Sequence, residues 1–408
     1  MKKDTLSRFF IALILGGICG IVVYSVRIPL PVLDVLHKIS GTGITVFNSM
    51  IKILIYPLGC FAFIDAFRLM WSMIRGHYSG GGDSVRTYIA TTILAVLLAI
   101  FIGSLLYDGL GGFMDFSPWL EARENVIMSS RLVETLTRLP LEIVCALSAL
   151  LGVVLAEIDK GRGEIRPPDK DGFKTMYKRF IQIIYKLYTV LPLMIFLVSF
   201  ELTARTGTAV FRFVLYYVIS VFVLVALHVL LVYSGTIKLK LKLSPLKFFE
   251  KSVSLVRVAG WTINSQETEP ITIRTATIKL GVPEKIAENV VLGGTTLNMD
   301  GTAIMQAVAI LLTANVYGIV FDSSSLWTLV LMVVITAMVT TAGTLTGMFT
   351  LGIIFHVFGV PVELLAIIIS ISHVVSVAVT PVNILGDLVA AMVVASDLGK
   401  LDRDVFNK

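Results

Sequence analysis

Long apolar runs recur along the chain and are separated by shorter polar connections. Each run has about 20 residues or more, the length that crosses a hydrocarbon core of about 30 Å as a helix. This pattern predicts an all-α fold with about eight transmembrane helices, and no sizeable soluble domain fits between them. The predicted spans are residues 8–28, 42–72, 84–107, 136–158, 175–203, 207–235, 286–318 and 362–398.

Two further apolar stretches are interrupted by polar residues near their middle. The first covers residues 245–282 and breaks at 264–270, with lysines near both ends. The second covers residues 323–360 and breaks at 340–347, with neither Lys nor Arg in its flanks. Polar, interrupted backbone is tolerated at membrane depth only where it is buried in protein or lines a wet cavity. We therefore interpret both as re-entrant helical hairpins, the first entering from the cytoplasmic side and the second from outside.

Each predicted hairpin is followed by a helix long enough to cross the membrane. Two interrupted segments that enter from opposite sides suggest an inverted repeat, which in transporters places a binding site near the bilayer midplane. The order of elements therefore predicts a membrane transporter whose site lies in the C-terminal third of the chain.

Composition agrees with the hydropathy pattern. Hydrophobic residues make up 56% of the 408 residues and charged residues 15%, against about 25% charged in soluble chains. The net charge of +6 does not indicate a nucleic-acid partner, because Lys and Arg cluster in alternate connections. By the positive-inside rule this alternation predicts a multi-pass protein of the cell (inner) membrane with both termini in the cytoplasm.

The predicted helix after the first hairpin contains Asn298 and Asp300 in the segment GGTTLNMDGT. An ionised Asp at membrane depth is costly and marks a functional site by default. The neighbouring glycines and threonines favour local unwinding, which would free carbonyl oxygens and turn both side chains inward. Such oxygen ligands suit a hard cation. The alternative is a protonated Asp300 hydrogen-bonded between helices.

The last predicted helix carries Asn383 and Asp387, which are four residues apart and share one helix face. Pro381 lacks a backbone N–H and can leave a carbonyl oxygen free nearby. We interpret this pair as a second cation site, and a capping or packing pair is the alternative.

The histidines do not indicate catalysis. His228 lies in an apolar run and is interpreted as a buried core side chain, and His356 and His373 have no obvious ligand partners. No Ser/His/Asp or metal-ligand set has credible spacing, so an intramembrane hydrolase is not supported and the protein is not expected to be an enzyme.

Three motifs in this order resemble one known family. The segments YIATT at 88–92, NMDGT at 298–302 and NILGD at 383–387 are similar to motifs of the glutamate transporter homologues, the dicarboxylate/amino-acid:cation symporters. The order hairpin, helix, hairpin, helix matches as well. The similarity is sharp over about 250–390 and diffuse upstream, as in a divergent member.

The resemblance implies a homotrimer in the lipid bilayer, in which a mobile transport domain moves in an elevator fashion against a scaffold. The implied scaffold consists of residues 1–80 (helices 1–2) and 111–204 (helices 4–5). The implied transport domain consists of residues 81–110 (helix 3) and 205–408 (helix 6, hairpin 245–282, broken helix 285–318, hairpin 323–360 and helix 8).

The resemblance also implies sodium ions as coupling ions and assigns residues to them. One site would use Gly294, Asn298, Asn383 and Asp387. A second would use Tyr88, Thr91, Thr92, Asn298 and Asp300. A third, built mostly from carbonyl oxygens, would use Thr296, Met299 and Thr341. The expected solute-binding residues are Ser265, Gln266, Glu267, Thr302, Gly343, Ser376, Val379, Thr380 and Asn383.

Departures from the family pattern bear on the solute. Ser376 stands where amino-acid carriers have an Asp for the amino group, and Val379 stands where carriers of acidic substrates have an Arg. Ile263 replaces an Arg that the first hairpin sometimes supplies. Aliphatic side chains cannot donate bidentate hydrogen bonds to a carboxylate, so aspartate and glutamate are disfavoured. Glu267 and Glu269 add acidic side chains at the tip of the first hairpin. One interpretation is that they pair with Arg274 or are solvated. The other is that they form a proton site or contact a cationic solute.

The expected function is therefore sodium-coupled symport of a small organic solute, a carboxylate or a neutral molecule. The alternatives are proton-coupled or uncoupled transport, and an anion channel or sensor that keeps the fold without active transport. Neither the solute nor the ion stoichiometry follows from the sequence.

Overall fold

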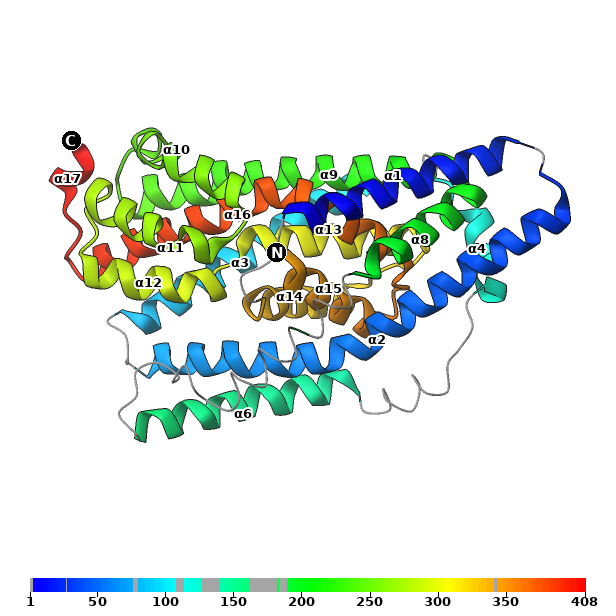
Figure 1. Cartoon of the computed structure of the whole chain (residues 1–408). Helices are drawn as coiled ribbons and strands as arrows, with labels where there is room; N and C mark the ends of the chain where they lie inside the picture. Colours follow the sequence, from blue (N-terminus) through cyan, green and yellow to red (C-terminus); the bar gives the residue numbers. More distant parts are fainter. Residues whose placement is uncertain are drawn as a thin grey trace.

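The computed structural model describes residues 3–26, 28–75, 80–107, 114–126, 140–161, 182, 189–340 and 344–408. In this part the chain is helical and contains no strand (Figure 1). The N-terminal helices are α1 (Lys3–Ser25), α2 (Leu30–Ile74), α3 (Gly81–Tyr107), α4 (Ser117–Val126), α6 (Leu141–Gly161) and α8 (Leu191–Thr206). The later ones are α9 (Ala209–His228), α10 (Pro245–Thr262), α11 (Ser265–Arg274), α12 (Glu284–Leu297), α13 (Asp300–Val316), α14 (Ser323–Met338), α15 (Thr344–Val357), α16 (Glu363–Asp397) and α17 (Arg403–Asn407).

Seven helical stretches within the described residues are long and apolar enough to cross a membrane. They are Ser7–Ser25, Leu30–Ile74, Gly81–Ser104, Leu141–Asp159, Ala209–Lys240, Glu284–Val316 and Glu363–Asp397. The remaining predicted span, 175–203, is described chiefly in its last part, as α8. The all-helical prediction is confirmed, and the count of eight stays a prediction.

The second predicted helix was placed too late. It was expected at 42–72, whereas α2 begins at Leu30. The polar residues that suggested a connection are accommodated within the helix by partners on α8. His37 Nδ1 lies 2.7 Å from Glu201 Oε2, and the Ser40 hydroxyl donates to the same oxygen at 2.5 Å. These contacts give His37 and Ser40 polar partners within the helix, which begins after Pro29 with Pro31 in its first turn.

Two helix pairs dominate the N-terminal part. α1 packs along α8, and α2 packs along α6 (Figure 1). The second pair buries an ion pair, in which Arg68 donates to both Asp159 oxygens at 2.6 and 2.7 Å. Because both partners are hydrogen-bonded to each other, the buried charges are compensated.

The first interrupted segment is a helical hairpin, as predicted. α10 ends where Ile263 adopts a left-handed conformation with φ of 54°. The Asn264 side chain then caps α11, accepting from the N–H groups of Gln266 at 3.0 Å and Glu267 at 3.4 Å. A short Asn side chain is well suited to this N-cap position. α11 continues into a π-helical turn, η3 (Thr275–Lys279).

The C-terminal tail packs at the open end of this hairpin. The Phe406 ring of α17 is fully buried. Lys251 of α10 donates to the carbonyl oxygens of Val405 and Lys279, both at 3.0 Å. Lys247 donates to the Asn407 carbonyl at 2.8 Å. The tail therefore joins the two arms of the hairpin at their base.

The second interrupted segment is the pair α14 and α15, again as predicted. Residues 341–343 between them lie outside the described residues. The Asp322 side chain caps α14, accepting from the Ser325 N–H at 2.7 Å. The arms are joined where the hydroxyls of Thr340 and Thr350 lie 2.9 Å apart, and Gln306 of α13 donates to Thr350 at 2.9 Å. The hairpin is thus hydrogen-bonded both to itself and to α13.

The core lies around α13 and α16, most of whose side chains are buried. α12 and α10 pack on α16, and α3 packs on α13. α9 is continued by two π-helical turns, η1 (Val229–Tyr233) and η2 (Thr236–Lys240). These elements meet around the short non-helical break between α12, which ends at Leu297, and α13, which begins at Asp300.

Candidate functional site

The helix that contains the NMDGT motif is broken within it, as expected. α12 ends at Leu297 and α13 begins at Asp300, so that Asn298 and Met299 are not helical. The Asn383 side chain of α16 caps the new helix, accepting from the N–H groups of Gly301 at 2.8 Å and Thr302 at 3.4 Å. The break therefore places a carboxylate at the positive end of a helix dipole, which stabilises its charge.

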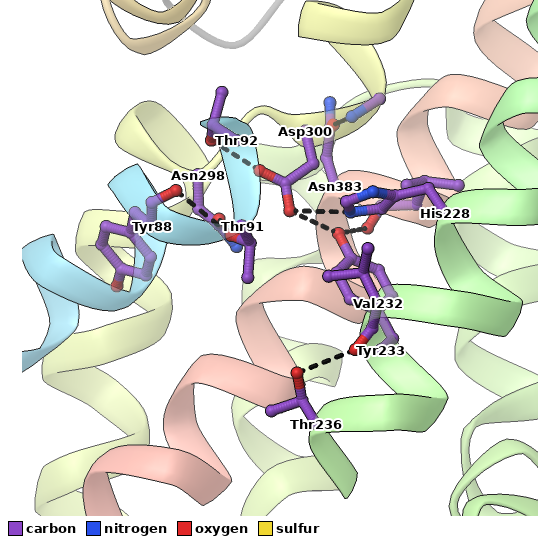
Figure 2. A network of polar contacts seen from close by, with 12 residues as sticks. Tyr88, Thr91, Thr92, His228, Val232, Tyr233, Thr236, Asn298, Asp300 and Asn383 are labelled. Carbon is purple, nitrogen blue, oxygen red and sulfur yellow. Dashed lines mark hydrogen bonds and ion pairs between the residues drawn. The ribbon is translucent and has the colours of Figure 1, made fainter. Parts of the chain in front are cut away.

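The Asp300 carboxylate lies between α3 and the α9–η1 segment (Figure 2). Its Oδ1 accepts from the Thr92 hydroxyl at 2.6 Å. Its Oδ2 accepts from the Tyr233 hydroxyl at 2.8 Å and lies 3.3 Å from His228 Nε2. All four side chains are completely buried. The carboxylate is thus surrounded by protein hydrogen-bond donors.

The Asp387 carboxylate of α16 has a different environment. The Asn298 amide donates to its Oδ1 at 3.0 Å, and its Oδ2 has no hydrogen-bond partner although the side chain is buried. The Thr91 hydroxyl lies 3.5 Å from Asn298 Oδ1, so α3 is joined to this site too. Gly294 lies directly against the carboxylate, and a Cβ at this position would overlap it.

The unpaired oxygen of Asp387 fits a bound cation. An unpaired buried carboxylate oxygen is costly unless a ligand satisfies it. The neighbouring side chains Asn298 and Thr91 carry oxygen atoms, and neither carries a thiolate or an imidazole. Within the described residues, no group of three or more His, Cys, Asp and Glu side chains is arranged to hold a metal ion. The donor set therefore suits a hard monovalent cation better than a transition metal.

A small cavity of about 40 Å³ is lined by Met299 at the break between α12 and α13 and by Asn383 of α16. Its lining comes from the hairpin tips, from the broken helix and from α16, and it contains no charged side chain. The lining residues are Ile263, Ser265, Met299, Thr302, Met305, Thr340, Gly347, Ser376, Val379, Thr380 and Asn383. The cavity offers hydroxyls, one amide, thioethers and aliphatic groups.

Most of the predicted solute residues lie together on this cavity. They are Ser265, Thr302, Ser376, Val379, Thr380 and Asn383. Gln266 and Glu267 do not line it, because they lie on the exposed side of the first turn of α11. Glu267 instead accepts from the Asn264 amide at 3.0 Å. Gly343 lies outside the described residues, so its position stays a prediction.

The predicted sodium-binding residues also lie near the break between α12 and α13, but their surroundings differ. Tyr88 donates to the Val290 carbonyl at 2.5 Å and so holds α3 to α12. Met299 lines the cavity, and its sulfur accepts from the Asn383 amide at 3.2 Å. Thr296 is half-buried in the last turn of α12. Thr341 lies outside the described residues.

Two residues at the centre of the site were not predicted. His228 is buried, as its apolar run predicts, but its ring lies against Asp300, and the sequence gives no signal for Tyr233. A π turn explains why they act together, because it places a residue nearly above the one five positions earlier. In an α-helix the same two residues would point about 0.4 of a turn apart. Their rings pack edge to face at 4.7 Å.

Long apolar helices that surround a buried polar site between broken helices define the class of an integral membrane transport protein. The model of the sodium:dicarboxylate symporter family matches residues 6–397, and the chain belongs to this family. The family consists of transporters and not of enzymes.

Individual relatives agree with this assignment. The chain is 25% identical to the proton/sodium-glutamate symport protein of Bacillus subtilis, over 97% of this chain and 93% of that protein. It is 23% identical to the protein of the same name from Geobacillus stearothermophilus, over 99% of this chain and 97% of that protein. The similarity to human excitatory amino acid transporter 2 is 28% over 151 residues, 37% of this chain and 26% of that relative. The chain thus spans about a quarter of the human protein and nearly all of the bacterial ones.

Proposed function

We propose that this chain carries out sodium-coupled symport of a small organic solute. The observation that carries the proposal is the buried Oδ2 of Asp387, which has no hydrogen-bond partner. A sodium ion bound there would compensate the carboxylate and draw the broken ends of α12 and α13 together. Asn383 lies one turn from Asp387 on the same helix and lines the cavity, so one helix contributes to both sites. Cation and solute binding would therefore favour each other reciprocally.

The proposed solute carries at most one carboxylate. Val379 and Ile263 line the cavity and supply no donor for a second carboxylate. Ser376 supplies no charge for an amino group. Hydroxyl and amide side chains beside thioethers suit a small, mostly neutral molecule with a few hydrogen-bonding groups. Although the bacterial relatives are named for glutamate, the cavity does not favour that solute.

Movement of one unit against another is proposed to carry the loaded site across the bilayer. The moving unit would contain residues 81–110 and 205–408, and the static unit residues 1–80 and 111–204. In such an elevator the static units assemble as a homotrimer in the cell membrane, with both chain termini in the cytoplasm. α14 and α15, hydrogen-bonded through Thr340 and Thr350, would act as the outer gate.

A screen followed by a flux measurement tests the proposed function. Metabolites are first screened for a rise in melting temperature that requires sodium. The hits are then tested in proteoliposomes, where an inward sodium gradient should drive accumulation and a potassium gradient should not. Asp387→Asn should abolish accumulation, and Asp397→Asn is a matched control at the exposed end of the same helix. Equal flux with and without the sodium gradient would refute sodium coupling.

A further inference from the structure

The two buried carboxylates at this site are not equivalent. Asp387 receives one amide hydrogen bond and keeps one oxygen without a partner. Asp300 uses both oxygens, and its partners Thr92, Tyr233 and His228 come from two different elements (Figure 2). Three hydrogen-bonding positions around Asp300 are therefore occupied by protein groups, whereas Oδ2 of Asp387 has none occupied.

The three partners of Asp300 differ in whether they would allow a metal ion to bind beside the carboxylate. A hydroxyl can turn its hydrogen away and coordinate an ion through its oxygen. Tyr233 has such an alternative, since the Val382 carbonyl lies 3.1 Å from its hydroxyl. Thr92 has the same rotational freedom. Neither residue by itself excludes a metal ion from Asp300.

His228 has no such freedom. Its Nε2 lies 3.3 Å from Asp300 Oδ2, and when the carboxylate is ionised this nitrogen carries a hydrogen, because two lone pairs would otherwise face each other. This N–H is fixed in the plane of a ring that is completely buried and packed edge to face on Tyr233. A metal ion at Asp300 would meet this N–H, and displacing it would leave a buried donor without an acceptor, at a cost of about 1–3 kcal/mol.

We propose that His228 takes the place of a metal ion at Asp300. The Asp300 carboxylate then belongs to the protein's permanent hydrogen-bond network, and Asp387 is the carboxylate that binds sodium. The chain therefore binds one metal ion fewer than its motifs alone would predict. His228 acts as a positioning residue that sets the ion stoichiometry, and this role rests on the proposed sodium coupling.

Equilibrium binding of radioactive sodium to the purified full chain tests the assignment. At saturating sodium, Asp387→Asn should lose about one ion per chain and Asp300→Asn should lose none. Glu201→Gln is the matched control, because Glu201 is also buried and also pairs with a histidine, away from the site. Loss of an ion in Asp300→Asn, with the control unchanged, would overturn the proposal.

Substitutions of His228 separate this role from simple packing. His228→Ser removes the fixed N–H and supplies a hydroxyl oxygen, so the bound sodium should rise by about one ion per chain. His228→Lys keeps N–H donors and supplies no oxygen, so it should retain the wild-type count. A wild-type count in His228→Ser would overturn the role assigned to His228.

A measurement on the unaltered chain removes any dependence on folding of the variants. Crystals soaked in thallium(I), a heavy monovalent cation, should show an anomalous peak beside Asp387 and none at Asp300. A peak at the Asp300 carboxylate would overturn the proposal even if every variant misfolds. If the unaltered protein binds no sodium, the proposed function itself fails, and that outcome is distinct from an ion at Asp300.

Discussion

A buried carboxylate at the start of α16 joins the two units that we propose to move against each other. Glu363 accepts from the Asn48 amide and the Tyr317 hydroxyl, each at 3.0 Å, and pairs with Arg123 at 3.2 Å. Asn48 of α2 and Arg123 of α4 belong to the proposed static unit, and Glu363 and Tyr317 belong to the proposed moving unit. In the proposed mechanism these contacts would break in each transport cycle.

The strength of the Arg123–Glu363 pair follows from its burial. Glu363 is completely buried and Arg123 is 33% exposed. Breaking a fully buried pair costs about 3–5 kcal/mol, and an exposed pair contributes about 0–1 kcal/mol. A pair with one partner buried should lie between these limits, at about 2 kcal/mol. This value corresponds to a factor of about 30 in an equilibrium constant.

A double-mutant cycle measures this value. Unfolding free energies are determined in one detergent for the wild type, Arg123→Ala, Glu363→Gln and the double variant. The coupling energy should be about 2 kcal/mol, because each single variant removes the same ion pair. Initial uptake rates of the four proteins then show whether the same contact slows the transport cycle.

The Lys240–Asp397 pair at the other end of α16 is the control. Its atoms lie 2.9 Å apart, but the side chains are 50% and 43% exposed, so its coupling should be below about 0.5 kcal/mol. A coupling of the same small size for Arg123 and Glu363 would refute the reasoning from burial. A large coupling in stability with no change in uptake rate would instead argue against the division into two units.

Three further changes should have defined outcomes. Asp387→Asn should weaken sodium binding by about 1,000-fold, since a charge pair at 4 Å is worth about 4 kcal/mol at an effective dielectric constant of about 20; sodium-dependent melting checks this. Gly386→Ala should displace Tyr233, because the added Cβ would lie 2.6 Å from its hydroxyl; a lower melting temperature with reduced transport is expected, and an unaltered protein would contradict it. Hydrogen bonds from the Ser325 hydroxyl and N–H hold the pKa of Asp322 below its usual range. The stabilisation by this helix cap is therefore present above the ordinary Asp pKa and is lost as the pH falls through the lower folded value; the melting difference between wild type and Asp322→Asn should be constant near neutral pH and shrink only in acid.

The hairpins and the broken helix could be predicted because their causes are local. Asn264 interrupts an apolar run at a position where its side chain caps the next helix. Asn298 and the glycines before it interrupt another. Such residues act on backbone within a few positions, so the sequence alone reveals where the helices end. The start of α2 has a local signal in Pro29 and Pro31, whereas the pairing of His37 and Ser40 depends on Glu201 of a distant helix and could not be found in this way.

The surroundings of Asp300 could not be predicted for the same reason. The role of His228 depends on a π turn that directs it and Tyr233 to one side, and neighbouring apolar residues do not reveal such a turn. A single histidine in an apolar helix is typical of a packed core. Its proximity to Asp300 follows only from the way α9 packs on α13. One sequence feature could have suggested it, namely that a buried Asp needs a partner and His228 is a polar residue in a facing apolar run.

The docking of the chain's last residues on the first hairpin has a mechanical consequence. Lys247 and Lys251 bind the tail and so fix the base of the hairpin. Ser265, at the opposite end of the hairpin, borders the cavity. Loss of the hydrogen bonds between these lysines and the tail would therefore change the position of the hairpin tip. An affinity tag fused after Lys408 should therefore disturb the base of the hairpin whose tip borders the cavity.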